Sequence, residues 1–168
     1  MRRELNVTPT KVTGRVTSGR NRASALVGTH TDEIEELTGL RCIPGSLNVV
    51  LEQPVRLQTE SALVFGVDRM LWHAQVGQLT VLAARWRRAR LHILELYATV
   101  NLRDALSVAD GQTITVTMDK ADFAPLSQRD ALAWHWFWSK GRGHLYYSSD
   151  FYKRLTAPVE LALGSLQD

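Results

Sequence analysis

Three short segments of this chain carry side chains suited to binding phosphate, a metal ion or a hydroxyl substrate. The first is the stretch Gly14–Gly19, where an alternating strand pattern runs into a Ser-Gly turn. Successive backbone N–H groups in such a turn can cradle a phosphate, and the neighbouring Arg20 and Arg22 add charged donors. An ordinary hairpin with solvated basic side chains would have the same residues.

The second segment is Pro44-Gly45-Ser46-Leu47-Asn48. If a strand begins near Ser46, the hydroxyl of Ser46 and the amide of Asn48 leave the same face, because side chains alternate along a strand. A pair of neutral oxygens can hold Mg²⁺ when nucleotide phosphates supply the negative charge. A turn in which Ser and Asn bond their own backbone is the alternative.

The third segment centres on Glu95, which interrupts an apolar strand pattern. A charge buried without a partner is costly. Glu95 therefore needs an ion-pair partner, solvent at the mouth of a barrel, or a ligand.

The elements that position these residues are mostly short strands. Alternating or β-branched runs separated by turn residues predict strands over 11–16, 24–27, 47–51, 62–67, 71–76, 79–84, 91–98 and 113–117. Many short strands at regular spacing favour a closed or nearly closed β-barrel.

Few helices are expected within this barrel. Thr31 is a candidate N-cap, followed by acidic residues and a helix that ends at Gly39. A helical turn is expected over 102–106. Beyond residue 118 the composition becomes aromatic, and Ser127 is expected to cap a helix that ends near Trp138, with a second helix from Ser149 to about Leu155. This extension would cover the barrel, act as a lid or aromatic platform, or form a dimer interface.

Composition limits the function classes. The 168 residues suffice for one domain with an appendage, and the net charge of +3 suits anionic small molecules without demanding nucleic acid. The single cysteine, Cys42, excludes an intramolecular disulfide. The N-terminal segment lacks the apolar run of a secretory signal, and no run approaches the roughly 18 residues of a membrane helix. We expect a cytoplasmic protein with no membrane partner, monomeric or homodimeric.

Taken in order, the three segments resemble the CTP-dependent riboflavin kinase family, which is typical of archaea. The resemblance rests on the strand and Ser-Gly loop, the Pro-Gly-Ser-Leu-Asn segment, and Leu-Glu-Leu followed by Val-Asn-Leu-Arg, and it covers roughly residues 11–118. It implies a mainly β fold, a cradle-loop β-barrel with one or two short helices. We therefore divide the chain into an arm (1–10), the kinase-like barrel (11–118) and a helical, aromatic-rich C-terminal extension (119–168).

The resemblance also implies roles for individual residues. The metal, Mg²⁺, would be held by Ser46 and Asn48. Glu95 would contact riboflavin and lie near the hydroxyl to be phosphorylated, as the catalytic residue. CTP would be bound by the loop and by the segment after Glu95, which gives Gly19, Arg20, Asn21, Arg22, Ala23, Ser24, Ala25, Asn101, Leu102, Arg103 and Asp104.

The sequence departs from the family pattern in three places. The loop lacks the usual repeated glycines, which restricts backbone approach to phosphate. Ala98-Thr99 replaces the family's Ala-Pro, and the strand beside His92 is shortened, so the other flavin-contacting residue is not placed.

Two other functions therefore stay open. One is a barrel that binds a nucleotide or flavin without catalysis. The other is a nucleic-acid-binding regulator, which would use the arginine-rich run 85–90.

Overall fold

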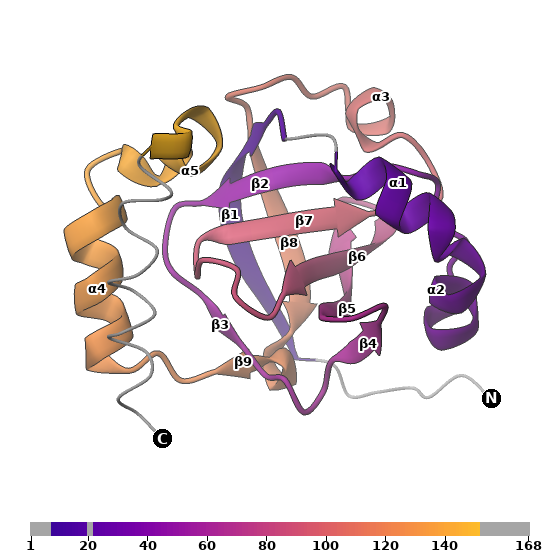
Figure 1. Cartoon of the computed structure of the whole chain (residues 1–168), viewed down its shortest axis with the longest axis horizontal. Helices are drawn as coiled ribbons and strands as arrows, with labels where there is room; N and C mark the ends of the chain where they lie inside the picture. The colour runs from indigo at the N-terminus through magenta and orange to yellow at the C-terminus, as the bar shows by residue number, and fades with distance from the viewer. Residues whose placement is uncertain (1–7, 20–21, 152–168) are drawn as a thin grey trace.

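The computed structural model describes residues 8–19 and 22–151 and consists mainly of antiparallel strands. Six strands close into a barrel in the order β5-β6-β7-β2-β1-β8, with β8 pairing back to β5, and β4 adds to the outer edge of β5 (Figure 1). The barrel strands are β1 (Pro9–Thr17), β2 (Leu47–Leu51), β5 (Arg69–Val76), β6 (Leu79–Trp86), β7 (Ile93–Tyr97) and β8 (Thr113–Asp119), and the added strand is β4 (Leu63–Phe65). The predicted β-barrel is confirmed.

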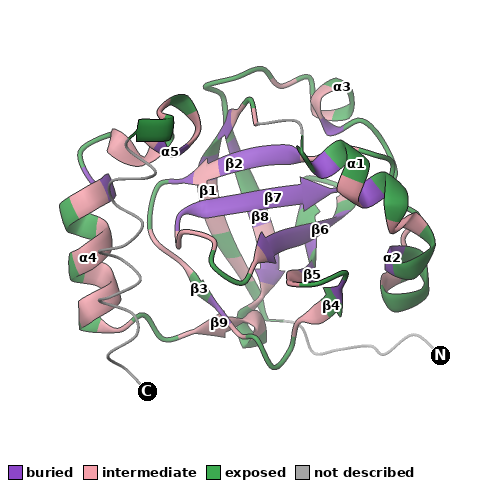
Figure 2. Cartoon of the chain, in the orientation of Figure 1, coloured by how far each residue is buried: buried purple, intermediate pink, exposed green. Residues whose placement is uncertain are grey.

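The barrel interior is filled by one set of alternating side chains. Leu47 and Val49 of β2 and Leu94 and Leu96 of β7 belong to this core, as does Val16 of β1. Figure 2 shows β2, β7 and β6 as the most continuously buried strands. Their outer faces are buried as well because helices lie against them, which explains why their sequences are nearly continuous apolar runs.

Two helices cover one end of that outer face. They are α1 (Arg22–Thr29) and α2 (Thr31–Thr38), and Val27 and Ile34 are fully buried against the strands. The prediction of a strand over 24–27 is wrong. Ala23 and Val27 are spaced by one helical turn and both face the core, so burial favours a helix there.

The ends of α2 follow the sequence prediction in part. Gly39 adopts a left-handed conformation (φ 76°) and its N–H bonds to the carbonyl of Glu35, as expected for a C-cap. The N-cap is His30 rather than Thr31, because the Thr31 hydroxyl donates to the carbonyl of Val27 at 2.9 Å and Thr31 lies inside the helix.

The C-terminal extension covers the opposite end of the outer face (Figure 1). It contains α4 (Gln128–Trp138), capped by the Ser127 side chain as predicted, and α5 (Leu145–Ser148). Trp138 and Tyr146 are buried against Ile93 of β7, whereas Trp136 is 75% exposed. The helix predicted from Ser149 lies largely outside the described residues.

The remaining elements are short. The predicted helical turn is α3, and the sequence prediction missed a two-stranded sheet of β3 and β9 and two 3₁₀ helices. Their bounds are α3 (Leu102–Leu106), β3 (Arg56–Leu57), β9 (Phe123–Ala124) and 3₁₀ helices at Lys120–Asp122 and Arg142–His144.

Candidate functional site

Asn48 and Glu95 lie directly opposite each other on the neighbouring strands β2 and β7. Their strand neighbours fill the barrel interior, so both side chains point to the outer face, between the N-terminal helices and the C-terminal extension. Both are nearly buried, with 9% and 8% of their surface exposed. The predicted metal ligand Asn48 and the predicted catalytic Glu95 are therefore side by side.

Glu95 has two partners within the protein. Arg69 of β5 donates from Nη1 to Glu95 Oε2 at 3.1 Å, and Tyr97 donates its hydroxyl to the same oxygen at 2.9 Å. Burial, together with the Glu95 charge beside it, raises the pKa of the Tyr97 hydroxyl, which stays protonated as the donor. These contacts satisfy the requirement for a partner that the sequence raised.

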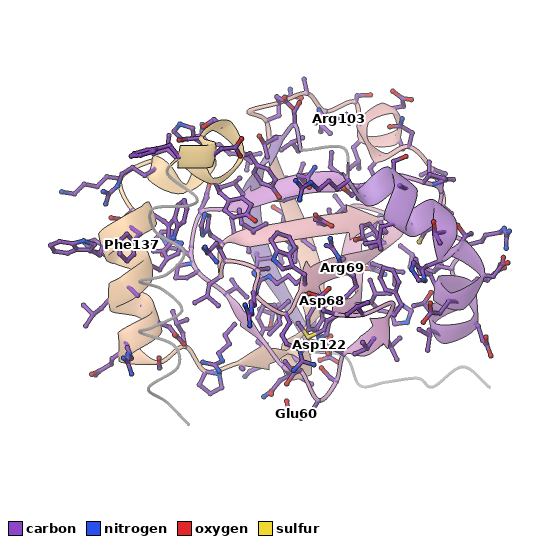
Figure 3. All side chains as sticks on the ribbon, viewed as in Figure 1. Glu60, Asp68, Arg69, Arg103, Asp122 and Phe137 are labelled. Atoms are coloured by element: carbon purple, nitrogen blue, oxygen red, sulfur yellow. The ribbon has the colours of Figure 1, made fainter. Side chains whose placement is uncertain are left out.

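Sequence reasoning missed Arg69, which is labelled in Figure 3. It lies at the start of β5, and the pairing of β5 with β6 and of β6 with β7 carries it across to Glu95. Its guanidinium also lies 5.2 Å from the centre of the Trp86 ring, in cation–π geometry. The sequence pointed to Arg69 only indirectly, because a buried Glu95 carboxylate needs an ion-pair partner and the sequence does not say which.

Asn48 is enclosed on two sides. The hydroxyl of Tyr147, from the extension, donates to Asn48 Oδ1 at 3.3 Å. On the other side Gly19 packs so closely that a Cβ there would lie 2.1 Å from Asn48 Nδ2. A side chain at position 19 would force the Asn48 amide to move, so this predicted loop residue adjoins the predicted metal ligand.

The rest of the predicted loop is only partly a loop. Arg20 and Asn21 lie outside the described residues, and α1 begins at Arg22. Ala23 is buried in the core, while Arg22, Ser24 and Ala25 are exposed on the first turns of α1. The helix α1 begins three positions after Gly19, and a helix N-terminus carries a partial positive charge that favours a phosphate.

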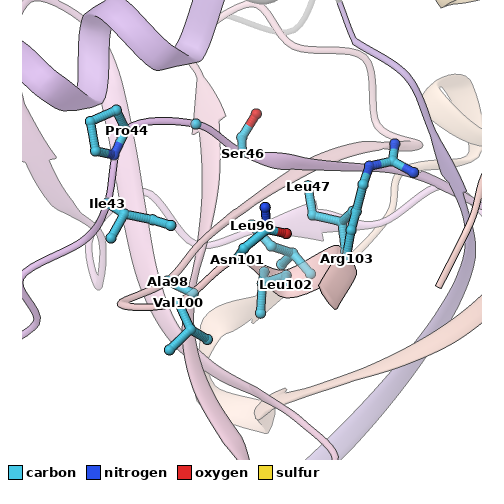
Figure 4. Close-up of a pocket in the computed structure, with 11 residues that line it drawn as sticks. Ile43, Pro44, Ser46, Leu47, Leu96, Ala98, Val100, Asn101, Leu102 and Arg103 are labelled. Atoms are coloured by element: carbon cyan, nitrogen blue, oxygen red, sulfur yellow. The ribbon is translucent and has the colours of Figure 1, made fainter. Parts of the chain in front are cut away.

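Ser46 borders a pocket of about 140 Å³ together with the nucleotide segment predicted after Glu95. Asn101, Leu102 and Arg103 all contribute to its wall (Figure 4). Asn48 and Glu95 are not among the lining residues. Figure 4 shows the Ser46 hydroxyl directed away from Asn101 and Leu102. The predicted residues thus form two neighbouring groups, one at the mouth of the barrel and one on its outer face.

Several members of the mouth group also have structural roles. The side chain of Asn101 caps α3 by accepting from the N–H of Asp104, and Leu102 is buried. Arg103 donates to the carbonyl of Thr17 at 3.2 Å and to Asp110 at 2.7 Å. Hydrogen bonds from Ser18 and then from Arg103 lower the pKa of Asp110. Through its bond to Thr17, Arg103 links α3 to the end of β1.

The two predicted metal ligands do not share a pocket, because Ser46 borders the pocket described above and Asn48 does not. A hydroxyl and an amide oxygen are both ligands that Mg²⁺ accepts, but they carry no charge. Among residues 8–19 and 22–151, no three His, Cys, Asp or Glu side chains converge as metal ligands. In this arrangement Ser46 and Asn48 do not form a joint Mg²⁺ site, and either would need charge from a bound phosphate.

The arginine-rich run does not form a basic patch. Arg85 is buried, and its guanidinium donates to three carbonyls, those of Ile93, Val55 and Leu91, at 2.7, 2.5 and 2.8 Å. Burial lowers its pKa to about 10. Of this run only Arg87 and Arg88 are exposed, so the run offers little surface to a nucleic acid.

Comparison with known proteins gives no family for this chain. No family model matches the sequence, and no curated protein matches it. Within the described part of the chain, no helix combines the length and apolar character needed to cross a bilayer.

Proposed function

We propose that this protein is a CTP-dependent kinase that transfers the γ-phosphate to the ribityl 5′-hydroxyl of riboflavin, or of a similar acceptor, to give FMN. The observation that carries the proposal is the pairing of Asn48 with Glu95 on one face, beside Gly19 and the start of α1. Such a transfer requires the residues that bind the phosphates to lie close to the carboxylate that accepts the proton of the acceptor hydroxyl.

Each residue has a role in this proposal. The N-terminus of α1 and the loop before it, including Gly19, Arg20 and Arg22, bind the phosphates. The segment from Asn101 to Asp104 contacts the rest of the nucleotide. Ser46 and Asn48 would have to come together when the nucleotide binds in order to hold Mg²⁺, which would neutralise charge on the phosphate oxygens.

Glu95 orients the acceptor hydroxyl and takes its proton as the hydroxyl oxygen attacks the γ-phosphorus. The bond from that phosphorus to the β–γ bridging oxygen breaks, and CDP leaves. Arg69 would hold Glu95 in place during this step, and Arg22 or Arg103 would stabilise charge on the transferring group.

One observation favours a second candidate, a barrel that binds a nucleotide or flavin without catalysis. The Glu95 carboxylate is already bonded to Arg69 and Tyr97, so it has no need of a substrate hydroxyl. In that case the site would bind CTP and leave the acceptor unchanged.

The two candidates are separated by one assay. The protein is incubated with riboflavin, Mg²⁺ and either CTP or ATP, and the products are resolved by chromatography. We expect FMN with CTP and little with ATP. Calorimetry then measures binding: CTP or riboflavin bound without FMN formation would favour the non-catalytic barrel, and binding of neither would overturn both candidates.

A further inference from the structure

A separate pocket lies where β5 changes its partner strand. Residues 69–71 of β5 pair with β4, whereas Ala74 and Gln75 pair with β8. Because β6 occupies the other edge of β5 along its whole length, β4 and β8 share one edge and separate between these residues. The separation leaves a pocket of about 560 Å³, here called the seam pocket. The residues that line it include Leu63, Leu71, His73, Met118, Asp119 and Asp122.

The seam pocket is distinct from the candidate site. Its lining residues include none of those predicted to bind the nucleotide, the metal or the acceptor, and none that borders the pocket beside Ser46. Figure 3 labels Asp122 near the lower end of the barrel and Arg103, from the predicted nucleotide segment, at the upper end. A ligand in the seam pocket would therefore not occupy the nucleotide segment.

The walls of the seam pocket are mainly apolar. Leu63 comes from β4, Leu71 from β5 and Met118 from β8, so each of the three strands that meet at the seam contributes a hydrophobic side chain. Pockets that bind small molecules have roughly 300–1,000 Å³ and combine apolar walls with a few polar groups. The seam pocket has the size and the walls to hold a carbon skeleton.

Two carboxyl groups make one side of the pocket acidic. Asp119 accepts the N–H of Ala121 at 3.1 Å through Oδ1, which leaves its second oxygen available. Burial, with the Asp119 charge nearby, raises the pKa of Asp122, and a hydrogen bond from Ser61 and the charge of His73 oppose this shift. In the described part of the chain, no arginine or lysine lines the pocket.

The missing cation sets this pair apart from other carboxylates of the protein. Glu95 is paired with Arg69, and Asp130 is paired with Arg56. A metal ion does not fit the pair, because no three His, Cys, Asp or Glu side chains converge as ligands within residues 8–19 and 22–151. An organic ammonium group does fit, since it has three donors and needs only acceptor oxygens around it.

We infer that the seam pocket binds a small organic amine, with its apolar body against Leu63, Leu71 and Met118 and its ammonium group between Asp119 and Asp122. The inference is independent of the proposed function, because no residue of the kinase site takes part. The apolar walls select the body of the ligand, and the two carboxylates select its charge.

The test uses two probes of nearly the same shape, phenylbutylamine and its neutral analogue phenylbutanol. Each is titrated into the full-length protein while the backbone amides are followed by NMR. We expect the amine to shift the amides of Leu63, Gln75 and Met118, which line the pocket. The amine should bind about tenfold more tightly than the alcohol, because only its ammonium group forms charge-assisted hydrogen bonds with the carboxylates.

Two variants remove the charges singly. Asp119→Asn keeps the oxygen that accepts the Ala121 N–H, and Asp122→Asn keeps the size of its side chain. Each should weaken binding of the amine about tenfold and leave binding of the alcohol unchanged. The matched control is Glu60→Gln, because Glu60 is exposed at the same end of the barrel (Figure 3) but does not line the pocket. Its affinity for the amine should equal that of the wild type.

Three results would overturn the inference. The first is an amine that binds no more tightly than the alcohol, or that does not bind. The second is a set of amide shifts that lies away from the seam pocket. The third is a loss of affinity in Glu60→Gln as large as that in Asp122→Asn, which would reveal only a general attraction of cations to acidic surface.

Discussion

The outer face of β2, β7 and β6 has two covers of different chemistry. The N-terminal cover, α1 and α2, buries Val27, Ile34 and their neighbours in an apolar cluster that includes Phe65. The C-terminal cover, α4 and α5, buries Trp138 and Tyr146 around His92. Within residues 8–19 and 22–151, no hydrogen-bond partner is found for His92 Nδ1 or Trp134 Nε1.

The difference bears on how strongly each cover is held. Close apolar packing contributes stability with no polar cost, so the N-terminal cover belongs to the cooperative core. Buried polar atoms without partners reduce the gain from packing, so we expect the C-terminal cover to be held less strongly than the N-terminal one. It also carries the hydroxyl that contacts Asn48. Both covers therefore border the candidate site, the first through the start of α1 beside Gly19 and the second through the Tyr147 hydroxyl on Asn48.

The largest expected effect is in the N-terminal cover. Ile34→Ala removes a fully buried side chain and should lower the free energy of unfolding by about 3 kcal/mol, in a single transition seen by denaturant titration. Leu37→Ala, at a position 39% exposed on the same helix, is the control and should cost well under half as much. Equal losses of unfolding free energy in the two variants would show that the buried Ile34 is packed no more tightly than the partly exposed Leu37.

A smaller effect is expected in the C-terminal cover when the pH falls. Burial, with the charges of Arg85 and Arg90 nearby and opposed by a bond to the Gly143 carbonyl, lowers the pKa of His92 from 6.5 to about 3. Between these pH values His92 of the barrel binds a proton when the extension is undocked and releases it when the extension docks, so docking weakens as the pH falls below 6.5. The loss is about 2 kcal/mol at pH 5.

Tryptophan fluorescence measures this docking because Trp134 and Trp138 lie against His92. The emission should change between pH 6.5 and 4 while the far-UV signal of the barrel persists. His92→Leu should abolish this dependence, and the exposed His135→Gln on α4 should keep it. A pH response shared by the barrel and the extension would mean that the two covers unfold together.

The sequence was sufficient for the elements whose signal is local. Alternation and turn residues located the barrel strands. Gly39 located the end of α2 and Ser127 the start of α4. The prediction of a strand over 24–27 failed because four apolar or small residues fit a strand or a helix equally well in isolation. Only packing against Ile34 and the strands decides between them.

The candidate site was predictable residue by residue but not as an arrangement. The alternation along β2 and β7 placed Asn48 and Glu95 on strands, whereas strand register made them neighbours. Arg69 and Tyr147 were missed because no spacing rule connects residues 26 or 99 positions apart in sequence. Such contacts follow from barrel closure and from the docking of the extension.

The Glu95→Gln variant tests the central claim most directly, because it keeps the size of the side chain and removes the proton acceptor. With CTP, Mg²⁺ and riboflavin, chromatography should find FMN formation reduced at least a hundredfold, about the contribution of a general base, while calorimetry finds CTP affinity within a few-fold of wild type. FMN formation at the wild-type rate would remove Glu95, and its pairing with Asn48, from the mechanism.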